Sequence, residues 1–162
     1  MKQKTRKTLG AIGAICLAFA ASASSLAAPV DSAPSLSAAQ KKNPVLVRGQ
    51  YLVEQIGLCA DCHTPRNEKG QFVSDRWLAG SPLAFQPTVP MPWSPAAPPI
   101  AGLPTLTEAQ ALVFLQTGKR ADGSAPLPPM PEYRFNAQDA RAVVAYLKSL
   151  GTKPSDTMAT SR

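Results

Sequence analysis

Apolar residues recur at helical spacing in three separate stretches of the chain. The first stretch opens with Asn43, a good helix cap, followed by Pro44, whose fixed φ suits the first helical turn. Its apolar positions lie mostly three to five residues apart, as on one face of a helix. These positions are Val47, Tyr51, Leu52 and Ile56. The pattern predicts a helix that ends at Gly57.

A second helix is predicted after residue 106. Thr107 and Gln110 have the spacing of a capping box, in which each side chain accepts a hydrogen bond from the other residue's backbone. Gly118 suits the left-handed turn that ends many helices. The expected apolar stripe consists of Leu106, Leu112, Val113 and Leu115.

The third helix is predicted to start at Asn136, with Asp139 in its first turn, and to end near Gly151. Its apolar face consists of Ala140, Val143, Val144 and Leu147. No alternating strand pattern, internal repeat or phosphate-binding glycine loop competes with these helices. The chain is therefore expected to form an all-α domain with about three main helices.

A long proline-rich loop separates the first helix from the second. Residues 82–104 hold eight prolines, and no long helix or central strand tolerates that density. Three aromatic residues lie in or near the loop: Trp77, Phe85 and Trp93. These side chains favour a loop packed on the domain over a free tether.

The N-terminus has the layout of a secretory signal peptide over residues 1–27. Four basic residues precede an uncharged run, of which the strongly apolar part, Leu9–Ala20, is 12 residues long. This is shorter than the roughly 20 residues that cross a bilayer as a helix. We expect cleavage after Ala27 or Ala23 and export to the periplasm. A retained membrane anchor is the alternative.

The remaining segments divide at composition changes. Residues 28–42 read as a flexible lead-in, residues 43–151 as the folded domain and residues 152–162 as a disordered tail. The whole chain has 17 basic and 10 acidic residues, a formal charge of +7. Loss of residues 1–27 removes four basic residues and leaves +3. Such a small charge gives no reason to expect a nucleic-acid partner.

The cysteines carry the chemistry. One of the three, Cys16, lies inside the signal peptide, and the other two form the string Cys59-Ala-Asp-Cys62, with the only histidine, His63, directly after it. A C-x-x-C-H pattern is typical of covalent haem c attachment. On a helical turn both thiols face one side and can form thioethers with one edge of a porphyrin. His63 is then the expected proximal iron ligand.

Three other uses of these cysteines are conceivable. A structural zinc site needs four ligands, and two cysteines with one histidine do not supply them. A thiol-disulfide oxidoreductase could use the Cys59–Cys62 pair, but that class places its motif after a buried strand, whereas a helix precedes it here. A disulfide between the two would close a very small loop and stabilise little.

The sixth iron ligand decides what a haem here could do. With one histidine in the chain, the candidates are methionines: Met91, Met130 and, in the tail, Met158. We favour Met130 over Met91, because Pro128, Pro129 and Pro131 hold its backbone extended and lower the entropy lost in placing the sulfur. A methionine ligand closes the iron and favours electron transfer. A displaceable one would allow a peroxidase-like haem enzyme, which is the alternative.

Three segments resemble the class I c-type cytochromes of bacteria: RGQYLVEQIGLCADCHTP, LTEAQALVFLQTGKRADG and PPMPEYRFNAQDARAVVAYLKSL. The resemblance covers about residues 44–151. In particular, this part of the chain is similar to cytochrome c domains that serve periplasmic membrane-bound dehydrogenases. It implies a cytochrome c fold in which the first helix crosses the last near Gly49 and Tyr146. It also implies that Met130 is the distal ligand.

Motif and resemblance together predict a periplasmic protein with one covalent haem c that carries single electrons and is not itself an enzyme. Its iron would be held by His63 and Met130 and cycle between Fe(III) and Fe(II). Its expected partners are redox proteins, namely a periplasmic dehydrogenase, a terminal oxidase or both. No transmembrane span is expected once the signal peptide is removed.

Overall fold

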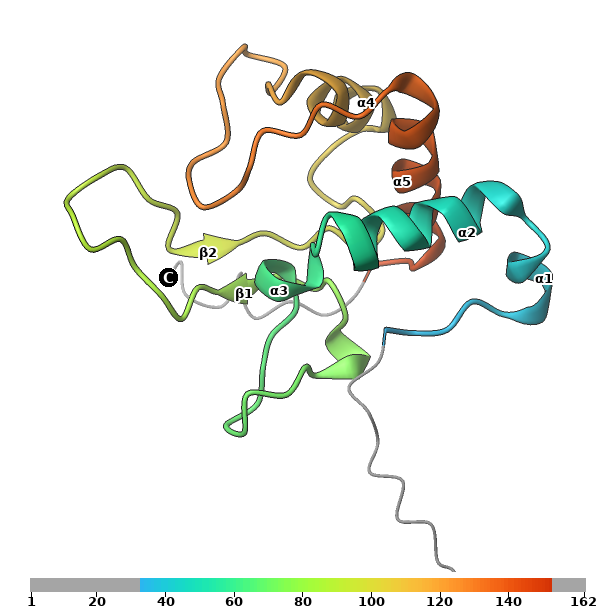
Figure 1. The fold of residues 1–162 in the computed structure, drawn as a ribbon, viewed down its shortest axis with the longest axis horizontal. Helices are drawn as coiled ribbons and strands as arrows, with labels where there is room; N and C mark the ends of the chain where they lie inside the picture. Colours follow the sequence, from blue (N-terminus) through green and yellow to red (C-terminus); the bar gives the residue numbers. More distant parts are fainter. Residues whose placement is uncertain (1–32, 153–162) are drawn as a thin grey trace, which may run out of the picture.

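A computed structural model describes residues 33–152 of the chain. Most of the regular secondary structure in this range is helical (Figure 1). The α-helices are α1 (Ala38–Lys41), α2 (Pro44–Tyr51), α3 (Ala60–His63), α4 (Glu108–Thr117) and α5 (Ala137–Ser149). A π-helix, η1 (Leu52–Ile56), continues α2, and a 3-10 turn, η2 (Ser74–Arg76), follows α3. Two short strands, β1 (Ser81–Pro82) and β2 (Ala96–Ala97), complete the elements. Within these described residues, no helix combines the length and the apolar character needed to cross a bilayer.

The three long helices start and stop where the capping residues predict. The Asn43 side chain caps α2, and Thr107 and Gln110 form both bonds of a capping box at α4. The Asn136 side chain accepts a backbone hydrogen bond at the start of α5. Gly118 ends α4 in the left-handed conformation, with φ of 71°. The starts of the three helices and the end of α4 are confirmed, whereas α2 itself ends at Tyr51 and η1 continues the helical turns up to Gly57.

The closest helix contact lies where α2 crosses α5 (Figure 1). A Cβ atom added to Gly49 would lie 2.0 Å from the carbonyl oxygen of Ala142 and 2.7 Å from the Cβ of Tyr146. Tyr146 is completely buried at this crossing. The crossing that the family resemblance implies is therefore confirmed, and only glycine fits position 49 without moving a helix.

The first helix does not bury the face that its spacing predicts. Three of the four expected apolar positions are about half exposed: Val47, Tyr51 and Ile56. The buried positions are Gly49, Leu52 and Val53. The close approach at Gly49 turns that side of α2 towards α5, and the wider π-turn of η1 shifts the side-chain phase beyond it. The predicted face was wrong for those three residues.

The two C-terminal helices differ in how well their faces were predicted. On α5, all four expected core residues are buried: Ala140, Val143, Val144 and Leu147. On α4, Ala111 and Leu115 face the core, whereas the side of the helix that holds Val113 is half exposed. A position two residues from both buried ones lies on the opposite side of a helix, so including Val113 in the stripe was wrong.

The described part of the expected lead-in is structured. Leu36 is buried in the core, and Ser37 forms a capping box with Gln40 at the start of α1. Residues 33–42 therefore differ from the flexible segment that their composition predicts, because one apolar side chain anchors them. The predicted signal peptide, residues 1–27, lies outside the described residues, as does the predicted tail except Thr152.

The proline-rich loop carries a small ladder where no strand was expected. Strands β1 and β2 pair antiparallel, with Ser81 opposite Ala97 and Pro82 opposite Ala96. Of the three aromatic residues expected to be buried, Trp77 is buried and Trp93 is partly buried, but Phe85 is half exposed and packs edge-to-face on Trp93.

Candidate functional site

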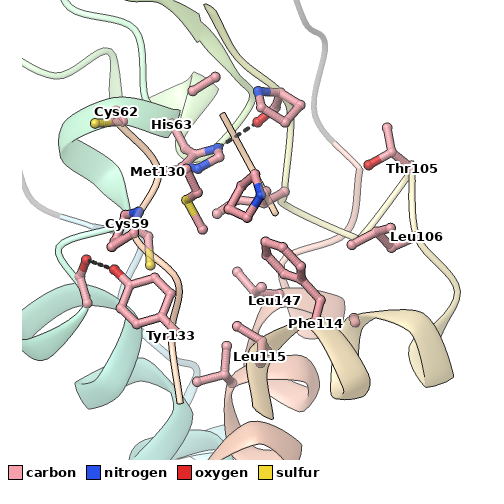
Figure 2. A pocket seen from close by; sticks show the side chains of 18 of the residues that line it. Cys59, Cys62, His63, Thr105, Leu106, Phe114, Leu115, Met130, Tyr133 and Leu147 are labelled. Carbon is pink, nitrogen blue, oxygen red and sulfur yellow. Dashed lines mark hydrogen bonds between the residues drawn. The ribbon is translucent and has the colours of Figure 1, made fainter. Parts of the chain in front are cut away.

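A cavity of about 670 Å³ opens between α3, the proline-rich loop and helices α4 and α5 (Figure 2). Four of the residues singled out from the sequence line it: Cys59, Cys62, His63 and Met130. The rest of the wall is largely apolar and includes Leu52, Val53, Ile100, Leu106, Phe114, Leu115, Phe135, Val143 and Leu147. Its size and lining are those of a site for a small molecule or cofactor.

The backbone before Cys59 is unusual and places that residue at the cavity wall. The π-helix η1 ends at Gly57, whose N–H donates to the carbonyl oxygen of Leu52 at 2.7 Å. Leu58 then adopts a left-handed conformation with φ of 49°, and Cys59 is the N-cap residue directly before α3. Three residues on, within this short helix, Cys62 also reaches the cavity.

Both thiols are free, and neither has the environment of a reactive cysteine. Burial raises the pKa of the Cys59 thiol to about 11, and burial, together with the charge of Asp61, raises the pKa of Cys62. This direction is the opposite of the pKa shift that activates a catalytic thiol. Within residues 33–152 the structure shows no group of three or more His, Cys, Asp or Glu side chains that could hold a metal ion.

His63 is held in one orientation. The residue is 6% exposed, and its Nδ1 lies 2.7 Å from the carbonyl oxygen of Pro98, which can only accept a hydrogen bond. Nδ1 is therefore the protonated nitrogen, and Nε2 keeps its lone pair for a metal. Burial also lowers the pKa of the imidazole, which favours the neutral, ligating form.

The structure separates the two candidate methionines. Met130 and the prolines on either side of it line the same cavity as His63 (Figure 2). The backbone N–H of Ser94 donates to the carbonyl oxygen of Pro128 and ties down this segment. Met91 is 46% exposed and belongs to a separate hollow formed by residues 83–95. Met158 lies outside the described residues.

Sequence reasoning missed two contributors to the site. The Pro98 carbonyl is a backbone group, and nothing in the sequence distinguishes it. Tyr133 lines the cavity, and its hydroxyl donates to the carbonyl oxygen of Gly57 at 2.6 Å. Burial is the larger cause and the nearby thiols the smaller one of a pKa of Tyr133 that is raised to about 12. The hydroxyl therefore keeps its proton and acts as a hydrogen-bond donor. Its position three residues after Met130 is the one feature of the sequence that could have indicated Tyr133 as a residue of the site.

Comparison with known proteins decides the family. Residues 46–151 match the cytochrome c family. The chain belongs to this family. For a cytochrome c, covalent haem c is the expected cofactor, and the cavity fits it: two thiols, an imidazole nitrogen and a thioether line one apolar space. Family membership also indicates an electron-transfer component.

This cytochrome c is similar to subunits of dehydrogenases. It is 34% identical over 126 residues to the cytochrome c subunit of a quinone alcohol dehydrogenase from Gluconacetobacter polyoxogenes, 69% of this chain and 26% of that protein. It is 32% identical over 139 residues to the cytochrome c subunit of gluconate 2-dehydrogenase from Pantoea cypripedii, 75% of this chain and 30% of that protein. The fructose dehydrogenase cytochrome subunit of Gluconobacter japonicus is 29% identical over 113 residues, 65% of this chain and 22% of that protein. The chain thus spans less than a third of each of these relatives.

Proposed function

We propose that this cytochrome c binds one haem c and carries single electrons between redox partners in the periplasm. The observation that carries the proposal is the convergence of Cys59, Cys62, His63 and Met130 on one apolar cavity. Each of the four has the chemistry that a covalently bound haem with two protein ligands requires.

Each residue has a distinct role in this proposal. Cys59 and Cys62 form the two thioethers, and His63 is the proximal ligand through Nε2. Met130 is the distal ligand, and its soft sulfur favours the reduced state and keeps other ligands away. When bound, haem c supplies an iron that gains and loses one electron. The apolar wall excludes water from that iron, and the chain acts as an electron carrier that performs no catalysis of its own.

The proposal extends to location and domain organisation. The basic and then apolar pattern of residues 1–27 supports a secretory signal, which is consistent with haem c attachment outside the cytoplasm. Residues 28–42 would lead into a cytochrome domain over residues 43–151, with about three main helices and the proline-rich loop enclosing the haem. Residues 152–162 would form a tail.

A periplasmic dehydrogenase is the proposed electron donor, and a terminal oxidase the proposed acceptor. Similarity to the cytochrome subunits of alcohol, gluconate and fructose dehydrogenases supports the donor. Since this chain matches less than a third of the length of each of those subunits, the partner of this chain has to be found by direct assay. Reduction of the purified protein by candidate dehydrogenases, followed by absorbance, provides that assay.

The full chain, expressed in a host that matures c-type cytochromes, tests the function. We expect haem that stays with the protein after acid-acetone extraction, at one per chain in a pyridine haemochrome assay. The ferric protein should show the near-infrared sulfur-to-iron charge-transfer band. A haem-free protein would contradict the proposal and leave the thiol-disulfide alternative. Attached haem with no such band, and rapid cyanide or peroxide binding, would instead indicate a peroxidase-like haem enzyme.

A further inference from the structure

We propose that Tyr133 is a positioning residue that fastens the Met130 segment to the turn that carries Cys59, and that release of Met130 from the iron requires this fastening to open. The inference rests on the proposed function, because it concerns how firmly the distal ligand is held. It assigns a role to a side chain that contacts neither the His63 ring nor the thiols through a hydrogen bond.

The hydrogen bond from Tyr133 joins two parts of the chain that are 76 residues apart. Its acceptor, the Gly57 carbonyl, lies at the end of the π-helix and two residues before Cys59. Its donor lies three residues after Met130 (Figure 2). The donor-acceptor distance of 2.6 Å is at the short end for a neutral O–H···O bond. One bond therefore connects the segment before Cys59, expected on the proximal side of the haem, with the Met130 segment, expected on the distal side.

The surroundings keep this bond in place. The Tyr133 ring stacks on Phe135, with centroids 5.1 Å apart and planes 13° apart. A Cβ atom added to Gly57 would lie 3.0 Å from the Leu52 carbonyl oxygen, 3.2 Å from the Cys59 sulfur and 3.4 Å from the Tyr133 hydroxyl. Gly57, Cys59 and Tyr133 are thus packed with little free space. A shift of Tyr133 would therefore displace the turn at Gly57, which leads to Cys59.

Other bonds hold the same segment at its ends. The N–H of Ser94 donates to the carbonyl oxygen of Pro128, and the N–H of Phe135 donates to that of Leu115. Between these two bonds lie residues 129–134, which include Met130. Within residues 33–152, the Tyr133 hydrogen bond is the one we find between this stretch and the C-x-x-C-H region. Its loss would leave the stretch tied at its two ends and through the exposed ion pair of Glu132 with Lys119, without a hydrogen bond to the C-x-x-C-H region.

Imidazole competition on the ferric holoprotein tests the proposal. Imidazole nitrogen replaces the methionine sulfur on the iron without any electron transfer, and loss of the near-infrared charge-transfer band reports the exchange. Tyr133→Phe removes the hydroxyl and keeps the ring. A hydrogen bond that is made only in the methionine-bound state changes the equilibrium constant for ligand exchange by about a factor of ten or somewhat less. We therefore expect imidazole to bind about three- to tenfold more tightly to this variant.

Tyr51→Phe is the matched control, because it removes the hydroxyl of a half-exposed tyrosine on α2, and it should bind imidazole as the wild type does. Urea unfolding of the same proteins separates the proposed role from a general loss of stability. A Tyr133→Phe variant that unfolds more easily but binds imidazole within twofold of the wild type would overturn the proposal. Absence of attached haem or of the charge-transfer band in the wild type would instead refute the proposed function.

Discussion

The imidazole Nδ1 of His63 lies 2.7 Å from the carbonyl oxygen of Pro98, which is 35 residues away in the proline-rich loop. The bond connects the attachment motif to the loop that covers it. Because proline peptide units lack an N–H, this stretch offers acceptors with few competing donors. The loop therefore does more than enclose the cavity: it sets the tautomer of the proposed proximal ligand.

The first prediction concerns that proton. We expect the Nδ1–H of His63 to exchange slowly with solvent, because the residue is only 6% exposed and the proton is hydrogen-bonded. Proton NMR of the reduced, diamagnetic holoprotein after transfer to D2O measures its lifetime. His63 is the only histidine, so the signal has one possible source. Disappearance of the Nδ1–H signal in the first spectrum would show that the bond to Pro98 is not maintained.

Gly49→Ala should severely destabilise the holoprotein. The added methyl group would lie 2.0 Å from the backbone oxygen of Ala142, so α2 and α5 would have to separate. We expect a loss of about 3 kcal/mol or more in the free energy of unfolding, measured with urea. Val47→Ala, at a half-exposed site on the same helix, should cost about 0.5 kcal/mol or less. Equal effects of the two changes would contradict the observed crossing.

Glu54 should make stability depend on pH. Its carboxylate accepts hydrogen bonds from the Tyr146 hydroxyl and from Gln50, but burial outweighs these bonds and raises its pKa above the usual 4.5. The folded protein therefore favours the neutral form of the Glu54 carboxyl group. The contribution of this neutral group to the free energy of unfolding is lost as the pH rises through the folded-state pKa. Glu54→Gln stays neutral and keeps an oxygen acceptor. We expect it to be more stable than the wild type at pH 7 and equally stable below pH 4.5.

Urea unfolding at several pH values from 4 to 7.5 measures the stability difference between Glu54→Gln and the wild type. Glu68→Gln, which changes an exposed carboxylate in a loop, is measured in parallel as the control for a Glu-to-Gln change at the surface. A Glu54→Gln difference that is constant over the same range would show that Glu54 titrates alike in the folded and unfolded states.

Cys62→Ala should lower the yield of haem protein and leave the attached haem held by Cys59 alone. A single thioether leaves one vinyl group intact, which moves the pyridine haemochrome band to longer wavelength than in the wild type. Asp61→Ala changes an exposed residue between the two cysteines and should keep the wild-type spectrum. If Cys62→Ala also kept it, Cys62 would have no part in attachment.

Helix ends could be predicted from the sequence because capping is local. Asn43, Thr107 and Asn136 each bond to a backbone group within three residues, so side chain and partner are both visible in the sequence. Helix orientation could not be predicted as well. Val47 and Tyr51 are apolar or aromatic and correctly spaced, yet the contact at Gly49 with a helix almost 100 residues away decides which side faces inwards.

The same distinction holds at the site. The attachment motif, Cys59 to His63, is contiguous, and its spacing alone indicated its chemistry. The Pro98 carbonyl reaches the motif, and the Tyr133 hydroxyl reaches Gly57 just before it, only through the folded chain, over 35 and 76 residues. The Pro98 bond leaves no pattern in the sequence, and the Tyr133 bond leaves only the position of Tyr133 three residues after Met130. The left-handed Leu58 and the π-turn before it are equally hidden, because they result from the packing around the motif.

The central claim is that Met130 completes the iron site. The near-infrared charge-transfer band of the ferric holoprotein tests it most directly, measured in the wild type, Met130→Ala and Met91→Ala. We predict that the band is present in the wild type and in Met91→Ala and absent in Met130→Ala, which should also have a lower reduction potential. A band that persists in Met130→Ala, or that disappears in Met91→Ala instead, would contradict the account.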